Sequence, residues 1–334
     1  MLNRRMIKTN QPPQNPGRLT TPEEIFLITF SFFYGFLFSQ IPSNNFKDFD
    51  NYLNFASNSG EIIIAYTDIG LFQFLVNEPV WLIINATLGL VLVPETIVRT
   101  IIFIGAFSIA YLILRYNPKS FFLLILILFL PSVIKNYLVH LRQGTGIAVF
   151  LLGWFALDRG VRRFLIGLTP LIHASFFIII ICLMLTKILN YSRLTSHLKL
   201  FVFSLFAIFL AHGSIPLAEL MGARQGEQYG SHGVGVSGLG FVLWSASLLI
   251  MLGAKSGWLR SHIFEVSIII LYLAMYWVIP IAPRVFESGL ILVLLAGLSL
   301  DRARKQLWFG LVIFAGIIDW TQRVGQPAFG FAVS

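Results

Sequence analysis

Long apolar runs alternate with short polar segments along almost the whole chain. The runs that could cross a membrane lie at about 25–38, 96–114, 120–139, 144–157, 164–186, 198–213, 237–254, 262–281, 285–300 and 306–322. A membrane-crossing helix needs about 20 mainly apolar residues. The pattern therefore predicts transmembrane helices rather than a barrel, whose strands would be shorter and would alternate in polarity.

Two stretches depart from this pattern. Residues 61–93 carry polar and charged side chains, among them Asp68 and Glu78, at a frequency too high for one simple crossing. Residues 164–186 are long enough to cross, but a Thr-Pro step and His173 interrupt them. We expect each stretch to form a partial or re-entrant segment.

The composition agrees with a membrane protein. Of the 334 residues, 57% are apolar and 12% are charged, whereas soluble domains contain about 45–50% and about 25%. The single cysteine, Cys182, has no partner for an intrachain disulfide. Composition thus excludes a disordered chain, a disulfide scaffold and a nucleic-acid-binding protein, and the net charge of +9 bears on membrane orientation instead.

The basic residues indicate this orientation. If 61–93 makes no net crossing and 164–186 turns near His173 and returns, 17 of the 24 basic residues lie on the cytoplasmic side. A plain crossing at 164–186 would divide them 12 and 12. Because cytoplasmic loops are enriched in Lys and Arg, we expect the first arrangement, an all-α polytopic protein with about nine full spans plus two partial ones.

This topology divides the chain into three parts. Residues 1–24 form a cytoplasmic tail, because no suitable cleavage site for a signal peptide follows the first apolar run. Residues 25–322 form the transmembrane helical domain, with outer-face loops at 40–95 and 214–237, and residues 323–334 form an outer-face tail.

The charged residues predicted on the outer side need an explanation. The basic ones are Lys47, Arg99, Lys135, Arg142, Arg224, Arg284 and Arg323. The acidic ones are Asp48, Asp50, Glu61, Asp68, Glu78, Glu219, Glu227, Glu287 and Asp319. Ionisable groups near the membrane are costly unless they are paired or hydrated, so we expect an outward-facing polar cavity.

Two arginines are candidates for binding an anion in this cavity. Arg142, in Leu-Arg-Gln-Gly-Thr-Gly, opens a predicted helix, where the helix dipole disfavours a cation unless an anion such as phosphate lies nearby. Alternatively, Arg142 reaches lipid headgroups. Arg284 opens a later helix after two prolines and could be a second anion ligand or simply pair with Glu287.

His173 and three acidic residues are further candidates. His173 lies in an apolar segment and is either a packing residue or a functional ionisable group. Asp48 and Tyr52 share a helical face that excludes Asp50, and this segment is either part of the site or a solvated loop with a helix cap. Glu78, before Pro79, forms a cavity wall or an ordinary helix start.

Other sequence signals exclude some chemistry and leave some open. The glycine-rich loop 222–238, with Arg224 and Tyr229, resembles a mobile outer loop that could cover a site. The chain contains no phosphate-binding Gly-Lys-Ser/Thr motif and no paired-His or cysteine metal motif. We therefore expect no metal ion and no cofactor. No internal repeat is evident, which weakens a transporter interpretation.

The order of several short motifs resembles the EpsG-like family of bacterial polysaccharide polymerases, which are relatives of the Wzy polymerases. The strongest part is Arg142-Gln143-Gly144, followed by an apolar helix, a basic loop at 158–165, and His173 with Ser175 close behind. Asp48-Phe49 with Tyr52, Glu78-Pro79 and Arg284 extend the similarity over about residues 44–300. Here Ile172 replaces a usual Phe, and Asn45-Phe46-Lys47 replaces a usual Arg and Gly.

The resemblance implies a glycosyltransferase of the GT-C type in the bacterial plasma (inner) membrane. Such an enzyme joins oligosaccharide repeat units carried on undecaprenyl diphosphate at the outer face and releases undecaprenyl diphosphate. The expected catalytic residues are His173, Asp48, Arg142 and Arg284. The expected substrate-binding residues are Arg142, Gln143, Arg284, Tyr52, Asp50, Glu78, Arg224, Tyr229 and Lys135.

In the mechanism we expect, the arginines stabilise the departing diphosphate and His173, or else Asp48, accepts the proton of the attacking sugar hydroxyl. Partners would be lipid-linked glycans, membrane lipids, and flippase and chain-length regulator proteins, without nucleic acid. An O-antigen ligase, or a flippase for lipid-linked oligosaccharides, remains an alternative.

Overall fold

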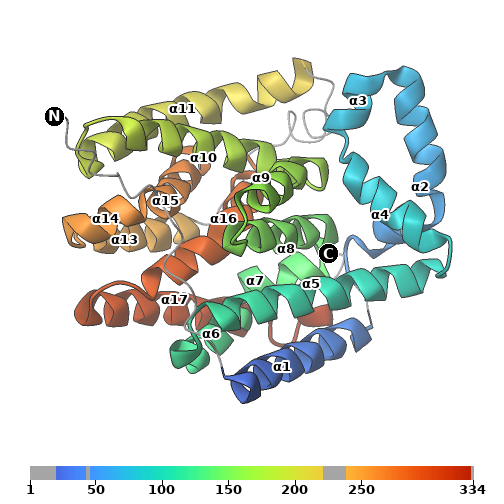
Figure 1. Ribbon diagram of the computed structural model, residues 1–334, viewed down its shortest axis with the longest axis horizontal. Helices are drawn as coiled ribbons and strands as arrows, with labels where there is room; N and C mark the ends of the chain where they lie inside the picture. Colours follow the sequence, from blue (N-terminus) through green and yellow to red (C-terminus); the bar gives the residue numbers. More distant parts are fainter. Residues whose placement is uncertain (1–19, 43–45, 221–237, 332–334) are drawn as a thin grey trace.

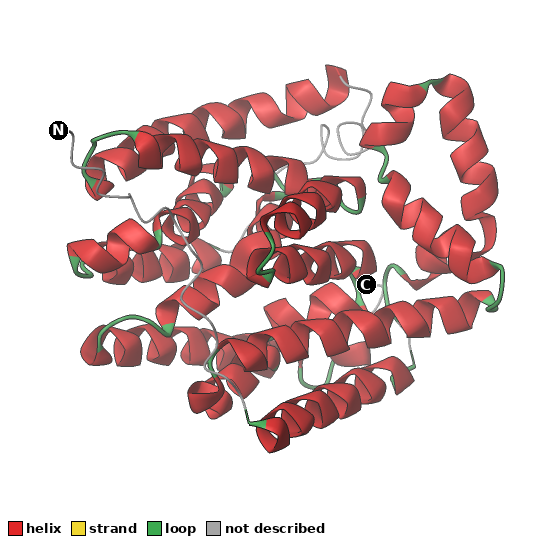
Figure 2. Ribbon diagram, in the orientation of Figure 1, coloured by secondary structure: helices red, strands yellow, loops and turns green. Residues whose placement is uncertain are grey.

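The computed structural model describes residues 20–42, 46–220 and 238–331, which form helices and turns without a β-strand (Figures 1 and 2). The α-helices are α1 (Thr21–Gln40), α2 (Phe49–Ile69), α3 (Leu71–Val76), α4 (Pro79–Gly89), α5 (Pro94–Tyr116), α6 (Phe121–Leu128), α7 (Pro131–Leu138), α8 (Leu141–Phe155), α9 (Arg159–Leu168), α10 (Ser175–Tyr191), α11 (Ser196–Leu220), α13 (Leu239–Leu252), α14 (Ser256–Ser261), α15 (Ile263–Met275), α16 (Ala282–Gly297) and α17 (Arg302–Arg323). Short 3-10 turns occur at η2 (Pro118–Ser120), η3 (Thr169–Leu171) and η4 (Pro327–Gly330).

The all-helical prediction is confirmed for these residues, and several helices are candidates for membrane spans. In the part of the chain that the structure describes, two helical segments are long and apolar enough to cross a membrane, Pro94–Tyr116 and Ser196–Gly213. The bent pair Pro118–Leu128 and Pro131–Leu138 would be a third if it forms one span. The count of about nine full spans stays a prediction.

The apolar run 120–139 is not the single straight helix that its length suggests. It forms α6 and α7, which meet at an angle of 72°. Pro131 is the first residue of α7, and a proline cannot donate the backbone hydrogen bond that would continue the preceding helix. Only two residues separate α7 from α8, and the carbonyl of Lys135 on α7 accepts a hydrogen bond from the amide of His140, just before α8.

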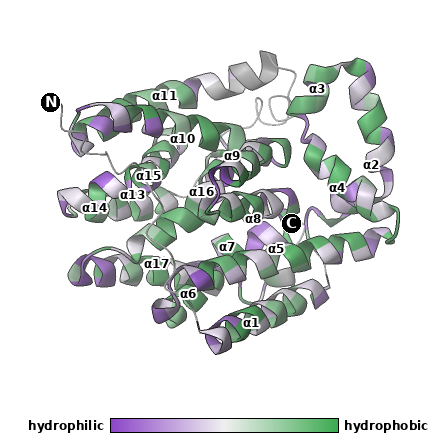
Figure 3. Cartoon of the chain, viewed as in Figure 1, coloured by the Kyte–Doolittle hydropathy of each residue, from purple (hydrophilic) through white to green (hydrophobic). Residues whose placement is uncertain are grey.

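Most helices consist largely of apolar residues, which are green in Figure 3, and many of these side chains are exposed. Phe33 on α1, Phe209 on α11 and Leu249 on α13 are among many large apolar side chains that are more than half exposed. Large exposed apolar surfaces are rare on soluble monomers and mark sites of contact with other molecules or with membranes. This surface suits contact with lipid.

The packed interior is organised around α5, α8 and the pair α15 and α16. Helix α5 packs against α1, α2 and α8, while α8 also packs against α9 and α16. Almost every residue of α16 is buried. Helix α8 therefore connects the first half of the bundle to the second, and its first turn lies where both halves meet.

Contacts between helix ends group the predicted cytoplasmic segments together. Arg115 at the end of α5 lies 3.7 Å from Glu24 at the start of α1. The rings of Tyr116 and Phe155, at the ends of α5 and α8, are 5.7 Å apart. These contacts agree with one common side for those ends, although its identity as the cytoplasmic side stays a prediction.

The segment before α2 lies beside the C-terminal segment. The amide of Lys47 donates a hydrogen bond of 3.1 Å to the carbonyl of Phe331, and Phe331 is buried. Both segments were predicted on the outer side, so their contact is consistent with that topology. The buried Phe331 therefore holds part of the predicted tail 323–334 against the protein.

The predicted break at His173 is confirmed. Helix α9 ends at Leu168, the turn η3 contains Pro170, and α10 begins at Ser175. Gly153, near the end of α8, packs against Leu165 and Ile166 of α9. The chain thus runs back along α8 and arrives beside its first turn before α10 starts.

Two helices extend into segments that were predicted to lie outside the spans. Helix α1 already begins at Thr21, within the predicted tail 1–24, and α11 continues to Leu220, within the predicted loop 214–237. The remainder of that loop, with Arg224 and Tyr229, lies outside the described residues, as do residues 1–19.

Single cysteines test the predicted orientation. In a Cys182→Ala background, Asn51→Cys places an exposed thiol at the start of α2 and Arg302→Cys places one at the start of α17. In right-side-out membrane vesicles, we expect a membrane-impermeant maleimide to label position 51 and to spare position 302 until the vesicles are opened. Labelling of position 302 alone in closed vesicles would contradict the orientation.

Candidate functional site

The first residues of five helices come together at one cluster of polar side chains. Asp48 directly precedes α2 and Glu78 directly precedes α4. Arg142, Ser175 and Arg284 lie in the first turns of α8, α10 and α16. The N-terminal end of a helix carries a partial positive charge and unpaired backbone N–H groups. Their convergence favours negative charge at this place.

Glu78 is the centre of the cluster. Its side chain is almost fully buried, and one carboxylate oxygen accepts a hydrogen bond from Nη1 of Arg142. The other oxygen lies 2.8 Å from Nδ1 of His173 and accepts a bond of 3.1 Å from the amide of Ala174. One carboxylate therefore holds both a cation and an imidazole in place.

The backbone of Glu78 is strained. Its φ of 62° and ψ of 52° place it in the left-handed region, which costs a residue other than glycine about 1–3 kcal/mol. Pro79 follows as the first residue of α4, so the predicted helix start with proline at its first position is confirmed. Strain of this kind persists where the surrounding contacts compensate for it, and the three donors to the carboxylate are such contacts.

Gln143 links α8 to α16. Its amide nitrogen donates to the carbonyl of Arg284 at 2.6 Å and lies 3.2 Å from the hydroxyl of Ser288. That hydroxyl is in turn 2.7 Å from the hydroxyl of Ser175 on α10. The backbone of Arg284 is thus held against the first turn of α8, and α10 is held against α16.

Gly144 allows this close packing. A Cβ atom at this position would lie 2.2 Å from the carbonyl oxygen of Asn136 on α7. No side chain fits there, so only glycine lets α8 begin directly against α7. The Gly of the Arg-Gln-Gly motif thus has a steric reason.

Asp48 occupies a second charged position of the cluster. Its carboxylate lies 3.4 Å from Nδ1 of His140. Burial opposes ionisation of Asp48, but the hydrogen bond and charge of His140, with the charges of Arg284 and Arg142, outweigh burial and lower its pKa. Asp48 is therefore a carboxylate at neutral pH.

Aromatic residues of α2 and α4 form one wall beside Arg142. The guanidinium carbon of Arg142 lies 5.3 Å from the ring centre of Phe55, a distance typical of a cation–π contact. The ring of Tyr52 lies 5.8 Å from that of Trp81. Burial raises the pKa of Tyr52 to about 12, so its phenol keeps its proton and can donate a hydrogen bond.

Lys135 forms an ion pair with Glu287 on α16, at 2.5 Å. The sequence had left open a pair between Arg284 and Glu287, which are three residues apart. The side chain of Glu287 is nearly buried, so Lys135 compensates its charge. This ion pair links α7 to α16 just after the first turn of α16.

Several buried polar atoms of the cluster have no hydrogen-bond partner among the described residues. They include Nε of Arg142, Oε1 of Gln143, Oε2 of Glu287 and Oδ1 of Asn136. Buried donors and acceptors are usually satisfied. The cluster therefore retains hydrogen-bonding capacity that a polar ligand could use.

The structure brings together eight of the predicted site residues, through direct contacts or close electrostatic interaction: Asp48, Tyr52, Glu78, Lys135, Arg142, Gln143, His173 and Arg284. Asp50 lies exposed on α2, as expected from the helical spacing. Arg224 and Tyr229 lie outside the described residues.

Sequence reasoning missed three contributors to the cluster. They are His140, Phe55 and Ser288. His140 lies only two residues before Arg142, so its position was a weak signal. Phe55 and Ser288 resemble ordinary helix residues, and only their tertiary contacts distinguish them.

Comparisons of this chain with protein-family models, curated proteins and solved structures find no match. Among the described residues, no group of three or more His, Cys, Asp or Glu side chains is arranged to hold a metal ion. The chemical interpretation of the cluster therefore depends on its own geometry. That geometry combines fixed cations, an oriented imidazole and the positive ends of helices.

The Glu78 and Arg142 pair should show strong energetic coupling. Glu78→Gln leaves a buried guanidinium without its counter-charge, which costs about 3–5 kcal/mol. Arg142→Gln leaves the buried carboxylate without its counter-charge in the same way. We expect the double variant to lose much less thermal stability in detergent than the sum of the single losses. Losses that add within about 0.5 kcal/mol would indicate independent sites and contradict this pairing.

The pair of Asp48 and His140 should make stability depend on pH. Because the pKa of Asp48 is lower in the folded protein, the ionised carboxylate contributes stability above its ordinary pKa of about 3.9 and loses it as pH falls further. We expect the melting temperatures of wild type and Asp48→Asn to differ at pH 5–7 and to converge as the pH falls through the lowered pKa of Asp48. Asp50→Asn, at an exposed position, should show little difference at any pH. A constant difference for Asp48→Asn down to acid pH would contradict stabilisation of the ionised Asp48 carboxylate by its neighbours.

Proposed function

We propose that the chain is a membrane glycosyltransferase that polymerises polysaccharide repeat units on the outer face of the bacterial plasma membrane. The donor and the acceptor would both be oligosaccharides linked to undecaprenyl diphosphate. The observation that carries the proposal is the shared carboxylate of Glu78, which holds Arg142 and His173 beside the first turn of α16. The resemblance to EpsG-like polymerases supplies the substrate class.

The leaving group determines what the site must supply on the donor side. When the bond between the anomeric carbon and the diphosphate oxygen breaks, negative charge grows on the diphosphate. Fixed cations in a partly dry site stabilise such charge most effectively. Arg142 and Arg284 would provide them, and the converging helix N-termini would add to the same field.

His173 is suited to accept a proton on the acceptor side. The hydrogen bond between Nδ1 and Glu78 orients the ring and leaves Nε2 for another partner, as a carboxylate does for histidine in hydrolases. The acceptor hydroxyl would lose its proton to Nε2 while its oxygen bonds to the anomeric carbon and undecaprenyl diphosphate leaves. Asp48 is the second candidate base, because it is ionised at neutral pH.

We assign Glu78 a positioning role rather than the sugar contact expected from the sequence. Its two carboxylate oxygens already accept bonds from Arg142, His173 and the amide of Ala174. A carboxylate whose oxygens are occupied in this way holds Arg142 and His173 in position. Tyr52 and Gln143 would then be better placed for sugar or phosphate oxygens, since Oε1 of Gln143 has no partner among the described residues.

Arginine replacement tests this function directly. Purified protein mixed with lipid-linked repeat units should produce a ladder of products on a gel. Arg142→Ala and Arg284→Ala should abolish the ladder and leave single units. His173→Ala should slow it by about 10²–10⁴-fold, the usual contribution of a general base.

Arg99→Ala is the matched control. Arg99 is the same residue type, is predicted on the outer side and lies exposed at α5, so this variant should retain the ladder. If the wild-type protein forms no glycosidic bond but moves lipid-linked sugars across vesicles, it is a flippase. Transfer of finished polymer to a lipid A core acceptor, without chain growth, would identify a ligase instead.

A further inference from the structure

A surface that is both basic and apolar lies at the start of α9, in the segment 158–165, which plays no part in the proposed sugar transfer. Arg159 and Arg163 are four residues apart and share one face of the helix, and both are exposed. Val161 and Phe164 share a different face and are 49% and 67% exposed. Exposed arginines and exposed apolar side chains on one helix are typical of a segment that lies at a membrane surface.

The arginines of this face are not compensated within the protein. Neither Arg159 nor Arg163 has an ion pair or a hydrogen bond from its side chain among the described residues. Residues 158–163 contain three arginines and one aspartate, which gives a net charge of +2, and no further Asp or Glu occurs along the chain before Glu219. The positive charge of α9 is therefore available to an anion from outside the chain.

Local contacts hold this surface in a fixed conformation. The side chain of Asp158 caps α9 by accepting a hydrogen bond of 2.8 Å from the amide of Val161. Nε and Nη2 of Arg162 donate hydrogen bonds of 3.2 and 2.6 Å to the carbonyl of Ala156, which directly follows α8. Asp158 and Arg162 thus stabilise the turn between α8 and α9, whereas the other two arginines point to no internal partner.

The surface lies at one end of a candidate membrane span. Helix α5 is long and apolar enough to cross a membrane. The ring of its last residue, Tyr116, lies 5.7 Å from the ring of Phe155, the last residue of α8, and α9 begins four residues later. If α5 crosses the bilayer, the start of α9 therefore lies at the depth of the lipid headgroups.

Two glycines leave room between the arginine face and Phe164. Gly160 and Gly167 lie between these faces, because successive residues follow the helical turn of 3.6 residues. A Cβ atom at Gly167 would meet nothing within 4 Å beyond its own helix backbone and chain neighbours, and one at Gly160 would meet only the capping carboxylate of Asp158. A headgroup can therefore approach the helix between the arginines and Phe164.

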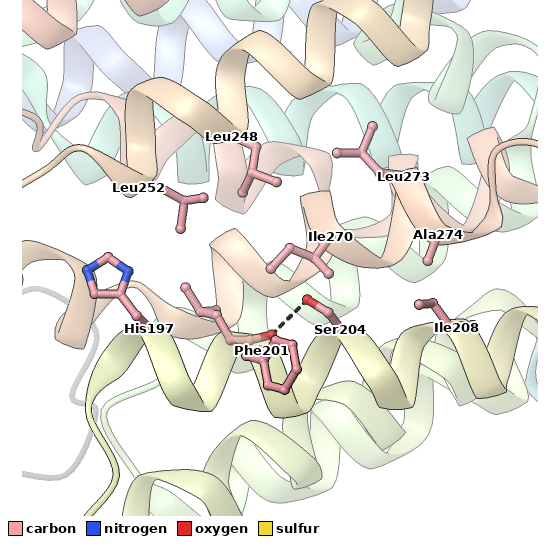
Figure 4. A pocket seen from close by; sticks show the side chains of 10 residues that line it. His197, Phe201, Ser204, Ile208, Leu248, Leu252, Ile270, Leu273 and Ala274 are labelled. Atoms are coloured by element: carbon pink, nitrogen blue, oxygen red, sulfur yellow. Dashed lines mark hydrogen bonds between the residues drawn. The ribbon is translucent and has the colours of Figure 1, made fainter.

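The groove between α11, α13 and α15 lacks this combination of features (Figure 4). Its volume is about 380 Å³, and its lining contains no arginine or lysine. The hydroxyl of Ser204, one of its few polar groups, donates a hydrogen bond of 2.8 Å to the carbonyl of Leu200 within α11. The groove thus offers mainly hydrocarbon contact, whereas α9 offers hydrocarbon contact and positive charge together.

We propose that the start of α9 binds the headgroup of an anionic phospholipid. The phosphodiester would lie against the guanidinium groups of Arg159 and Arg163, which form charge-assisted hydrogen bonds with phosphate oxygens. An acyl chain would pack on Phe164 and Val161. Charge selects an anionic lipid over a zwitterionic one, because a zwitterionic headgroup already carries a cation beside its phosphate. The inference is independent of sugar transfer.

Lipid binding can be measured by native mass spectrometry on the purified full-length protein. The probes are dioleoyl phosphatidylglycerol and dioleoyl phosphatidylcholine, which share acyl chains and differ in charge. We expect tighter retention of phosphatidylglycerol. Arg159→Gln/Arg163→Gln should weaken its binding about tenfold or more, since each cation near an anionic headgroup contributes about fivefold.

Three further variants separate charge, position and apolar contact. Arg193→Gln/Arg302→Gln is the matched control, because it removes two exposed arginines predicted on the same side of the membrane, and it should leave binding unchanged. Arg159→Lys/Arg163→Lys keeps the charge and should retain most of the binding. Phe164→Ser keeps the arginines but removes the apolar contact, so it should weaken binding severalfold. Melting temperatures in lipid-free detergent check that each variant is folded.

Several results would overturn the proposal. Equal binding of the two lipids would show that charge does not select the occupant. Equal losses in Arg159→Gln/Arg163→Gln and in the matched control would indicate a general response to net charge rather than a site on α9. Preferential retention of undecaprenyl phosphate that is lost in Arg159→Gln/Arg163→Gln would assign the surface to the lipid carrier. If Phe164→Ser does not fold, the arginine variants still decide the question.

Discussion

The rest of the site depends on the need to compensate a cation at the start of a helix. Arg142 lies in the first turn of α8, where the helix dipole disfavours positive charge, and most of its side chain is buried. Glu78 supplies the opposing charge from a strained backbone position before α4. Because the same carboxylate also binds His173 and the amide of Ala174, satisfying Arg142 positions the start of α10 as well.

This constraint explains why helices distant in sequence begin at the same place. Gln143 follows Arg142 directly and binds the backbone of Arg284, so the first turn of α8 connects α4, α10 and α16. Gly144 permits the approach to α7, and Lys135 on α7 compensates Glu287 on α16. Arg-Gln-Gly is thus a motif in which each residue makes a different tertiary connection.

Opposite charges hold the side chains of the cluster in place. In the cluster, Glu287 contacts Lys135 and Glu78 contacts Arg142, and both carboxylates are nearly buried. This arrangement fixes the side chains in a defined geometry.

The sequence by itself determined the helical class, most helix positions and the identity of the main charged residues. Apolar runs and prolines mark these features locally, and charges that oppose the orientation rule stand out without any structure. Only the tertiary structure decided that Glu78 faces both Arg142 and His173, that Glu287 pairs with Lys135, and that 120–139 bends. These outcomes depend on which helix starts meet in space, and periodicity along one helix carries no information about its neighbours.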